Sequence, residues 1–361
     1  MSERSATGDI LIAGGYGVVG RRIAALLAPT FVGRVVVAGR DEAKASAAAG
    51  QLGHGVRARR LDLSDAASIG AALDGVGTIM VCVSDHDLHL LRAAVTRGLG
   101  YTDIAPRLAF WKRAEEKNAE ARRTGARVLL GAGLSPGISN MMARQLKDVI
   151  GTADRVETAI LLSLGDEFGP DSLRHVLDSV SQSFAVIEDG RSKDAMPFSR
   201  GTRVVFPEPI GSKMAYLFPW SDVVYYPKTL GARTAVGRFA LEPSWAGRLA
   251  SLLVTLGATK SLGRPDRMKV FLRLIERIKG RSSRGDAFAL AVTVEGSGRT
   301  MRMGLAGHHQ ADVTAAGAAE LARQLAAGEV SGAGVWIPEE VVSPTRFFAM
   351  LAQRGIAPSA L

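Results

Sequence analysis

Residues 14–20, GGYGVVG, have the spacing of a phosphate-binding turn. They satisfy G-x-G-x-x-G through Gly15, Gly17 and Gly20, and G-x-x-G-x-x-G when counted from Gly14. An apolar run precedes the turn and apolar residues at helical spacing follow it, so we expect a strand, a turn and a helix. Such glycines let the backbone approach a pyrophosphate, whose charge the helix N-terminus stabilises. The pattern predicts a dinucleotide site, with a turn that only packs strand on helix as the alternative; its residues are Gly14, Gly15, Tyr16, Gly17, Val18 and Val19.

Arg40 follows the second predicted strand, twenty residues after Gly20. Folds that prefer NAD usually place an acid here for the ribose 2′-hydroxyl, whereas an arginine can pair with a 2′-phosphate. We therefore expect NADP (NADPH), although the neighbouring Asp41 keeps NAD open and Arg40 could be a solvated turn residue. Asp62 and Leu63 follow the third strand and are placed to border the adenine; Asp62 could instead cap the next helix.

Val83 and Ser84 end the fourth predicted strand, where the topology of such sheets places the nicotinamide. Ser84 is expected to cap the following helix, on which His86 and His89 would share a face. His86 could then act as an acid or base, and an exposed helix face is the alternative. The single cysteine and the absence of an HExxH motif predict no metal site.

Tyr101 and Asp103 follow the next helix and reach the same edge of the sheet. Either could donate or orient a proton, and a structural hydrogen-bonding role is the alternative. The catalytic candidates are therefore Asp103, Tyr101 and His86. No tyrosine has a lysine four residues later, which excludes the tyrosine and lysine pair of short-chain dehydrogenases, and there is no G-x-S-x-G nucleophile elbow.

Strand and helix patterns alternate over the first part of the chain, which predicts an α/β fold with a doubly wound parallel sheet. After residue 140 the pattern changes to short strands separated by Pro and Gly, which indicates a mixed sheet. Helices are expected at 107–124, 244–256, 266–279 and 313–327, and Ser297 with Gly298 predicts a hairpin turn.

The chain has 361 residues, one cysteine (Cys82) and a net charge of +10. Basic and acidic residues interleave through most of it, so no nucleic-acid partner is expected. The N-terminus lacks a signal-peptide pattern and no apolar run is long enough for a membrane span, which favours the cytoplasm. Much of the excess charge lies in residues 264–284, whose apolar residues recur at helical spacing. That segment could pack on its own domain or dock on an acidic surface, either an anionic membrane or an acyl carrier protein.

The sequence resembles the saccharopine dehydrogenase-like family of NADP-linked reductases. The resemblance rests on ILIAGGYGVVGRRIA, VVVAGRDEAKA, LDLSD, RGLGYTDIA, ARVLLGAGLSPGISNMMARQL and the C-terminal run from TAAGAAELARQL to TRFFAML. It is strongest in residues 8–142 and 312–354. The resemblance implies that the turn, Arg40, Val83 and Ser84, Asp103 and the loop LSPGIS line the cofactor and reaction cleft. Ser135 stands where many relatives have Asp, which leaves the substrate class open.

The family also implies a Rossmann domain, a second α+β domain with a mixed sheet, and C-terminal helices that return to the first domain. We place these at residues 1–135, 136–310 (substrate and dimerisation) and 311–361, and expect a homodimer. Family members reduce imines or oxidise amines, and one branch reduces enoyl chains. We therefore expect hydride transfer to or from a C=N carbon of a small-molecule substrate. The alternatives are a reductase of an enoyl or carrier-bound substrate and a non-catalytic NADP(H)-sensing protein.

Overall fold

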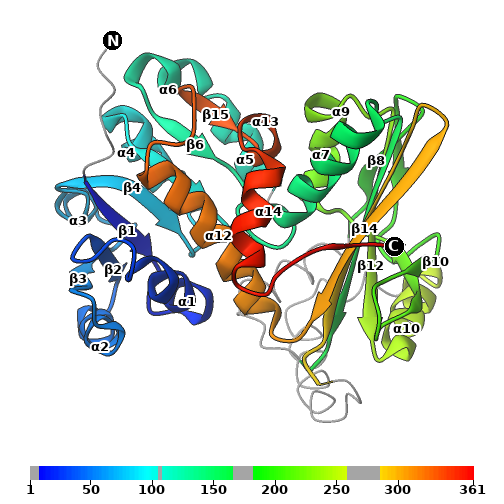
Figure 1. Ribbon diagram of the computed structural model, residues 1–361, viewed down its shortest axis with the longest axis horizontal. Helices are drawn as coiled ribbons and strands as arrows, with labels where there is room; N and C mark the ends of the chain where they lie inside the picture. Colours follow the sequence, from blue (N-terminus) through cyan, green and yellow to red (C-terminus); the bar gives the residue numbers. More distant parts are fainter. Residues whose placement is uncertain (1–7, 105–107, 166–181, 258–284) are drawn as a thin grey trace. The chain divides into compact units, whose positions relative to one another are not determined.

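The computed structural model describes residues 8–104, 108–165, 182–257 and 285–361 (Figure 1). Its chain forms two compact units. Unit 1 comprises residues 1–138 and 311–354, and unit 2 comprises residues 139–310 and 355–361.

Unit 1 is built on a seven-stranded parallel sheet with the order β15-β6-β5-β4-β1-β2-β3. Apart from β15, this is the strand order of a Rossmann sheet, with the reversal between β1 and β4. The expected doubly wound parallel sheet is therefore confirmed. The strands are β1 (Asp9–Ala13), β2 (Val35–Gly39), β3 (Arg57–Arg60), β4 (Val76–Val81), β5 (Gly100–Asp103), β6 (Arg127–Leu129) and β15 (Gly334–Trp336).

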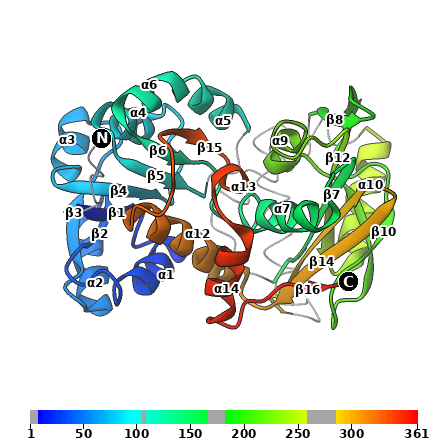
Figure 2. The same ribbon diagram turned by 45° about the horizontal axis from the view of Figure 1, so that its top comes forward.

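Helices cover both faces of this sheet, which is why its central strands are apolar on both sides. Figure 2 shows α3, α4 and α6 on one side, and α1, α2 and α12 on the other. The helices of unit 1 are α1 (Val18–Leu27), α2 (Glu42–Leu52), α3 (Ala66–Ala72), α4 (His89–Arg97), α5 (Leu108–Glu115), α6 (Asn118–Thr124), α12 (Gln310–Ala326), α13 (Pro338–Val341) and α14 (Pro344–Ala352).

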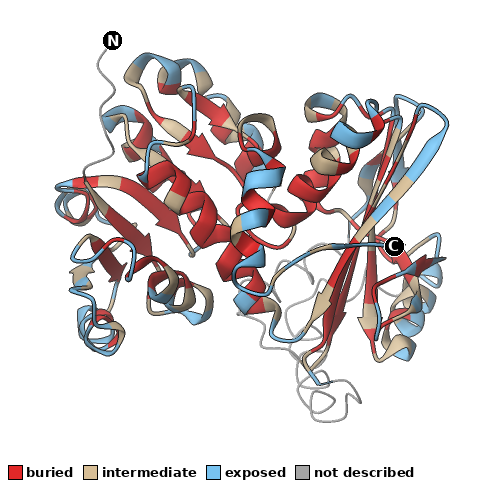
Figure 3. Cartoon of the chain, in the orientation of Figure 1, coloured by how far each residue is buried: buried red, intermediate tan, exposed pale blue. Residues whose placement is uncertain are grey.

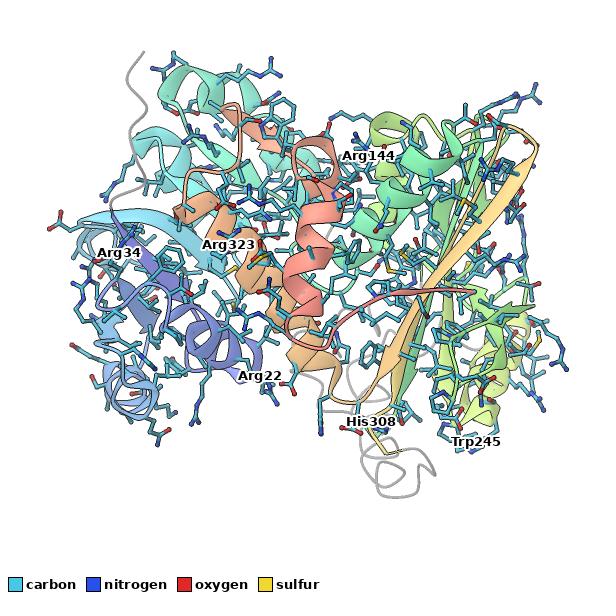
Figure 4. All side chains as sticks on the ribbon, viewed as in Figure 1. Arg22, Arg34, Arg144, Trp245, His308 and Arg323 are labelled. Atoms are coloured by element: carbon cyan, nitrogen blue, oxygen red, sulfur yellow. The ribbon has the colours of Figure 1, made fainter. Side chains whose placement is uncertain are left out.

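Helix α12 is buried along nearly its whole length (Figure 3). Its alanines and Gly317 permit this close packing: a Cβ on Gly317 would lie 3.1 Å from the side chain of Ile138. The guanidinium of Arg323, labelled in Figure 4, forms paired hydrogen bonds of 2.7–2.9 Å with the carboxylates of Glu320 and Glu329. Glu329 also pairs with Arg346 at 3.1 Å, which ties α12 to α14.

Unit 2 contains the expected mixed sheet, with the order β10-β11-β12-β7-β13-β14-β16 and a side branch of β8 and β9. The pair β7 and β12 is parallel, whereas β13 and β14 form an antiparallel hairpin through Ser297 and Gly298, as predicted. The strands are β7 (Arg155–Ser163), β8 (Phe184–Glu188), β9 (Arg191–Ala195), β10 (Thr202–Val205), β11 (Ser212–Leu217), β12 (Thr234–Glu242), β13 (Phe288–Gly296), β14 (Arg299–Gly307) and β16 (Ser359–Ala360).

Figures 1 and 2 show α7 (Ile138–Ile150) and α9 (Ser221–Thr229) along one face of this sheet and α10 (Ser244–Thr255) on the other. Four fully buried side chains form what we call the buried polar cluster: Ser139, Thr158, Asp222 and Tyr226. The Ser139 hydroxyl donates to the Asp222 carboxylate at 2.6 Å, and the Tyr226 hydroxyl lies 3.2 Å from the same oxygen. Thr158 Oγ1 lies 2.9 Å from the Tyr226 hydroxyl, which extends the cluster to β7.

Three sequence expectations differ from the structure. The helix expected at 107–124 is divided into α5 and α6 by a turn. Residues 355–361 do not lie with unit 1, because β16 pairs with β14 at the edge of the unit 2 sheet. The polar strand β9 was missed because its sequence, RSKDA, lacks a strand pattern. The helix expected at 266–279, like the basic segment 264–284, lies outside the described residues.

Within the described ranges, no helix is long and apolar enough to cross a membrane. The same ranges contain no group of three or more His, Cys, Asp or Glu side chains placed to hold a metal ion.

Candidate functional site

The glycine turn joins β1 to α1, and three of its glycines are required by packing. A Cβ on Gly14, which has φ +77°, would lie 2.5 Å from Val83 Cγ1. On Gly15 it would lie 2.9 Å from the Ile12 carbonyl oxygen, and on Gly20 only 2.3 Å from the Gly14 carbonyl oxygen. Real Cβ atoms do not approach other atoms this closely, so these positions keep strand and helix together whether or not a ligand binds.

Gly17 is different, because the space beside it is almost open. A Cβ there would meet only the Gly14 carbonyl oxygen, at 3.1 Å. Gly17 is also the N-cap of α1, and no side chain caps that helix end or places an acid in its first turn. The backbone N–H groups of Val18 and Val19 therefore begin an uncapped helix, which is the arrangement that stabilises a phosphate.

The residues after β2 separate the roles of Arg40 and Asp41. Asp41 is the N-cap of α2. Its carboxylate accepts a hydrogen bond from Lys44 N at 3.0 Å, and it forms an ion pair with Lys44 Nζ at 3.2 Å. That backbone hydrogen bond lowers the pKa of Asp41. Arg40 is exposed. The Tyr16 ring packs against Gly39, the last residue of β2. A Cβ on Gly39 would lie 2.4 Å from that ring.

Asp62 and Leu63 follow β3 and are both half-buried. The Asp62 carboxylate accepts hydrogen bonds from Ser64 N and Ser64 Oγ at 3.1 and 2.7 Å, and the hydroxyl lowers the pKa of Asp62. The cap of α3 is Asp65, which accepts from Ala67 N at 2.9 Å. Asp62 therefore shapes the loop and does not cap the helix.

Val83 and Ser84 lie just beyond the end of β4, beside the glycine turn. The Val83 side chain lies where a Cβ on Gly14 would be. Val83 is also partly exposed, and so is Val18 at the start of α1. Two partly exposed valines from neighbouring elements provide an apolar surface of the kind that a planar aromatic ring can pack against.

The helix after β4 begins later than the sequence suggested. Its cap is the buried Asp85 and not Ser84, because the Asp85 carboxylate accepts from His89 N at 2.9 Å and Leu90 N at 2.8 Å. His86 lies in the preceding turn, exposed, with its carbonyl oxygen bonded to Arg113. His86 and His89 therefore do not share a helix face.

Tyr101 and Asp103 project from β5 and are fully buried. Burial raises the pKa of Tyr101, and the Asp103 carboxylate raises it further, so the phenol stays protonated. The same two causes raise the pKa of Cys82, which remains a thiol. Asp103 also holds the next loop: Gly131 N donates to its carboxylate at 3.3 Å and Ala132 N to its carbonyl oxygen at 2.6 Å.

The loop LSPGIS is closed on itself in unit 1. Gly133 and Gly137 form a parallel bridge, and Ile138 N donates to the Gly133 carbonyl oxygen at 3.0 Å. Gly137 has φ +129°, and a Cβ there would lie 2.2 Å from that oxygen. The glycines of this loop are therefore required by its own geometry.

The parallel register brings most of the predicted residues to one edge of the sheet. Ala38, Ala13, Val81 and Asp103 are aligned across β2, β1, β4 and β5, so the residues that follow them share the carboxyl edge. His86 lies beyond this row in an exposed turn. Sequence reasoning missed the capping carboxylate of Asp85, for which an Asp a few residues before an apolar helical run was the available signal.

Residues 10–129 match the family model described as the saccharopine dehydrogenase NADP binding domain. Among solved structures, the chain is similar to apo saccharopine dehydrogenase (L-Glu forming) from Saccharomyces cerevisiae, with a TM-score of 0.71, 15% identity, and 98% of this chain and 99% of that chain covered. A weaker similarity is to a myo-inositol dehydrogenase from Corynebacterium glutamicum, with a TM-score of 0.45 and 15% identity over 98% of this chain and 99% of that one. No curated protein sequence matches the chain significantly.

These findings confirm the expected α/β architecture and an oxidoreductase fold that takes a nicotinamide dinucleotide. They also agree with the order of the parallel strands and with the uncapped start of α1. Residues 10–129 therefore carry a saccharopine dehydrogenase NADP binding domain, and nearly the whole chain has the fold of saccharopine dehydrogenase.

Proposed function

We propose that the protein is an NADP-dependent oxidoreductase that transfers a hydride to or from a C=N carbon of a small-molecule substrate. In the reducing direction the nicotinamide supplies a hydride, with its electron pair, to the carbon, and the nitrogen takes up a proton. The C=N part of the proposal is supported by the family to which the first domain belongs, whose namesake forms or cleaves a secondary amine.

The observation that carries the preference for NADP is the engagement of Asp41. The Asp41 carboxylate already caps α2 through one oxygen and pairs with Lys44 through the other, so folding uses part of the acceptor capacity that a ribose 2′-hydroxyl would need. Arg40, beside it, is exposed at the carboxyl end of β2, where a guanidinium can form two charge-assisted hydrogen bonds with a 2′-phosphate. This division of tasks between Asp41 and Arg40 supports NADP over NAD in the proposal.

The other residues have distinct tasks in this proposal. Val18 and Val19 would direct their backbone N–H groups at the pyrophosphate, and Gly17 would leave room for it. Tyr16, Asp62 and Leu63 would border the adenosine half. Val83 and Ser84 would border the nicotinamide, where an apolar surface excludes water.

The three proton-donor candidates differ in access. Asp103 and Tyr101 are both buried. We propose that Asp103 positions the loop at Gly131 and Ala132 through its hydrogen bonds, and that Tyr101 remains a protonated phenol beside it in β5. His86 is the exposed candidate for proton transfer, since an imidazole can act as a general acid or a general base.

Arg40→Ala tests the cofactor assignment. Loss of two charge-assisted hydrogen bonds should weaken NADPH binding by roughly 1.5–3 kcal/mol and leave NADH binding nearly unchanged. Calorimetric titration of both cofactors measures the effect, with Arg354→Ala, at an exposed position at the end of unit 1, as the matched control. Equal losses for both cofactors would reject NADP preference, and failure of either cofactor to bind below millimolar concentration would reject the function.

A further inference from the structure

Helix α10 presents its largest side chains to solvent. Trp245, Leu249, Leu252 and Leu256 are 49, 43, 54 and 70% exposed, and we call these four residues the α10 stripe. Figure 3 shows exposed residues along α10, and Figure 4 places Trp245 at the outer surface of unit 2. Single exposed apolar residues are ordinary on protein surfaces, whereas four on one helix form a contiguous patch.

The spacing of the stripe confirms that it is one face. Steps of four, three and four residues keep the side chains within a narrow sector of a helix with 3.6 residues per turn. The opposite face carries the buried Gly247, and a Cβ there would lie 3.1 Å from the Tyr216 ring. The helix therefore packs on the sheet through its small residue and points its large apolar residues outward, which is the reverse of a helix that serves only to build a core.

We propose that the α10 stripe docks on the surface of an anionic lipid bilayer. A helix with such a face lies in the interfacial plane, with its apolar side chains buried about 5–10 Å deep. Tryptophan suits this position because its ring is apolar and its indole N–H can still reach the hydrated headgroups. The stripe does not cross the bilayer, so the proposal needs no membrane-spanning segment.

Charge supports the choice of an anionic surface. The chain carries a net charge of +10. Within α10 the single charged residue is Arg248, which is exposed, and no acidic residue interrupts the helix. Arg248 lies three residues after Trp245 and four before Leu252, so it borders the stripe, where a phosphate headgroup would pair with it.

A second copy of the chain fits the stripe less well. Four side chains that are about half exposed offer roughly 400 Å² of apolar surface, about half of the ~800 Å² that each partner buries in a stable interface. Two copies with a charge of +10 each also repel one another at low ionic strength. A lipid surface requires no complementary shape, and its negative charge attracts the whole protein.

Vesicle flotation of the full chain tests the proposal, with vesicles of phosphatidylcholine alone and of phosphatidylcholine mixed with phosphatidylglycerol. We expect binding to the anionic vesicles at low salt and a loss of most of it at high salt, because a Debye length of about 8 Å already applies at physiological ionic strength. Vesicles should also shift the tryptophan emission to shorter wavelength. Trp245→Phe should abolish that shift, since Trp111 and Trp220 are buried and the half-buried Trp336 lies in β15 of unit 1, away from the stripe in the chain.

Leu252→Glu and Leu256→Glu place a negative charge in the stripe and should each lower the vesicle partition coefficient at least about tenfold. Val32→Glu is the matched control, because Val32 is 65% exposed in unit 1, and it should bind as the unaltered protein does. All three variants should keep the unfolding temperature, since the replaced side chains face solvent. The proposal is overturned if anionic vesicles fail to bind or if the Leu and Val variants behave alike. It is also overturned if the Glu substitutions dissociate a dimer or a complex with an acidic carrier protein while vesicle binding persists.

Discussion

At the carboxyl edge of the unit 1 sheet, most residues of the candidate site lie at the end of a strand or just after it, and several stay partly exposed. In the buried polar cluster of unit 2, every side chain is fully buried, and Ser139 and Asp222 meet although 83 residues separate them. In the first region, helix α1 follows Gly17 with no capping side chain from this N-cap residue and no acid in its first turn. The second region satisfies its polar groups internally. A ligand site thus keeps polar groups available for the ligand, whereas a buried cluster that stabilises the fold pairs its polar groups with one another.

This difference predicts which property each region controls. Substitutions at the exposed positions of the carboxyl edge, such as Gly17 and Arg40, should alter cofactor binding and leave stability nearly unchanged. Substitutions in the buried polar cluster should alter stability and leave cofactor binding unchanged in the molecules that fold.

Gly17→Val should have the largest effect on binding. Its side chain would fill the space beside the α1 N-terminus, where an added Cβ would meet the Gly14 carbonyl oxygen at 3.1 Å and no other non-neighbouring atom of the described residues within 4 Å. We expect NADPH affinity to fall at least ~100-fold, equivalent to about 2.7 kcal/mol, when measured by fluorescence titration. Gly50→Val is the control, since Gly50 lies in α2 with open space around it. Unchanged affinity in a folded Gly17→Val protein would locate the cofactor elsewhere.

Asp222→Ala should have the largest effect on stability. It removes the acceptor of the Ser139 and Tyr226 hydroxyl groups and of Val223 N, which stay buried. We expect a loss of about 2–4 kcal/mol in the free energy of unfolding by urea. Asp194→Ala, on the exposed strand β9, should change it by less than ~0.5 kcal/mol. Weaker NADPH binding by folded Asp222→Ala protein would show that the two regions are coupled.

Glu329→Gln addresses a third arrangement, partly exposed and charged. The Arg323 guanidinium holds the pKa of Glu329 below its ordinary value. A carboxyl whose pKa is lowered by folding stabilises the protein above its unfolded pKa and loses that effect as the pH falls through the folded value. We expect Glu329→Gln to cost roughly 0.5–1.5 kcal/mol at neutral pH and almost nothing once the pH has fallen below the folded pKa of Glu329, as measured by urea unfolding over a series of pH values. A difference that stays constant with pH would contradict the charge-based cause.

The carboxyl edge could be predicted from the sequence because its signals are local. Glycine spacing, the apolar strands and the position of Arg40 all lie within short windows, and parallel register then aligns them without further information. The buried polar cluster could not be predicted, because nothing in the sequence near Ser139 or Thr158 indicates that Asp222 will lie beside them. Pairing across long separations depends on which helices pack on which strands.

The start of α4 shows a subtler limit. Ser84 and Asp85 are both good capping residues, and the sequence offers both within one step of each other. The left-handed conformation of Leu88, with φ +61°, delays the helix to His89, so that Asp85 reaches its N–H groups. One residue with an unusual backbone conformation therefore removed His86 from the helix on which it was expected.

The discontinuity of unit 1 bears on how the protein is made. Strand β15 pairs with β6 through Val335 and Val128, but residues 139–310 of unit 2 are encoded between them. On the ribosome, β6 must therefore wait at an open sheet edge until these residues have been translated, and open edges invite mispairing. A gene fragment that ends at Ile138 would keep this edge permanently exposed. The nucleotide-binding module can be excised from this gene only if the segment coding for α12 and β15 is spliced back onto it.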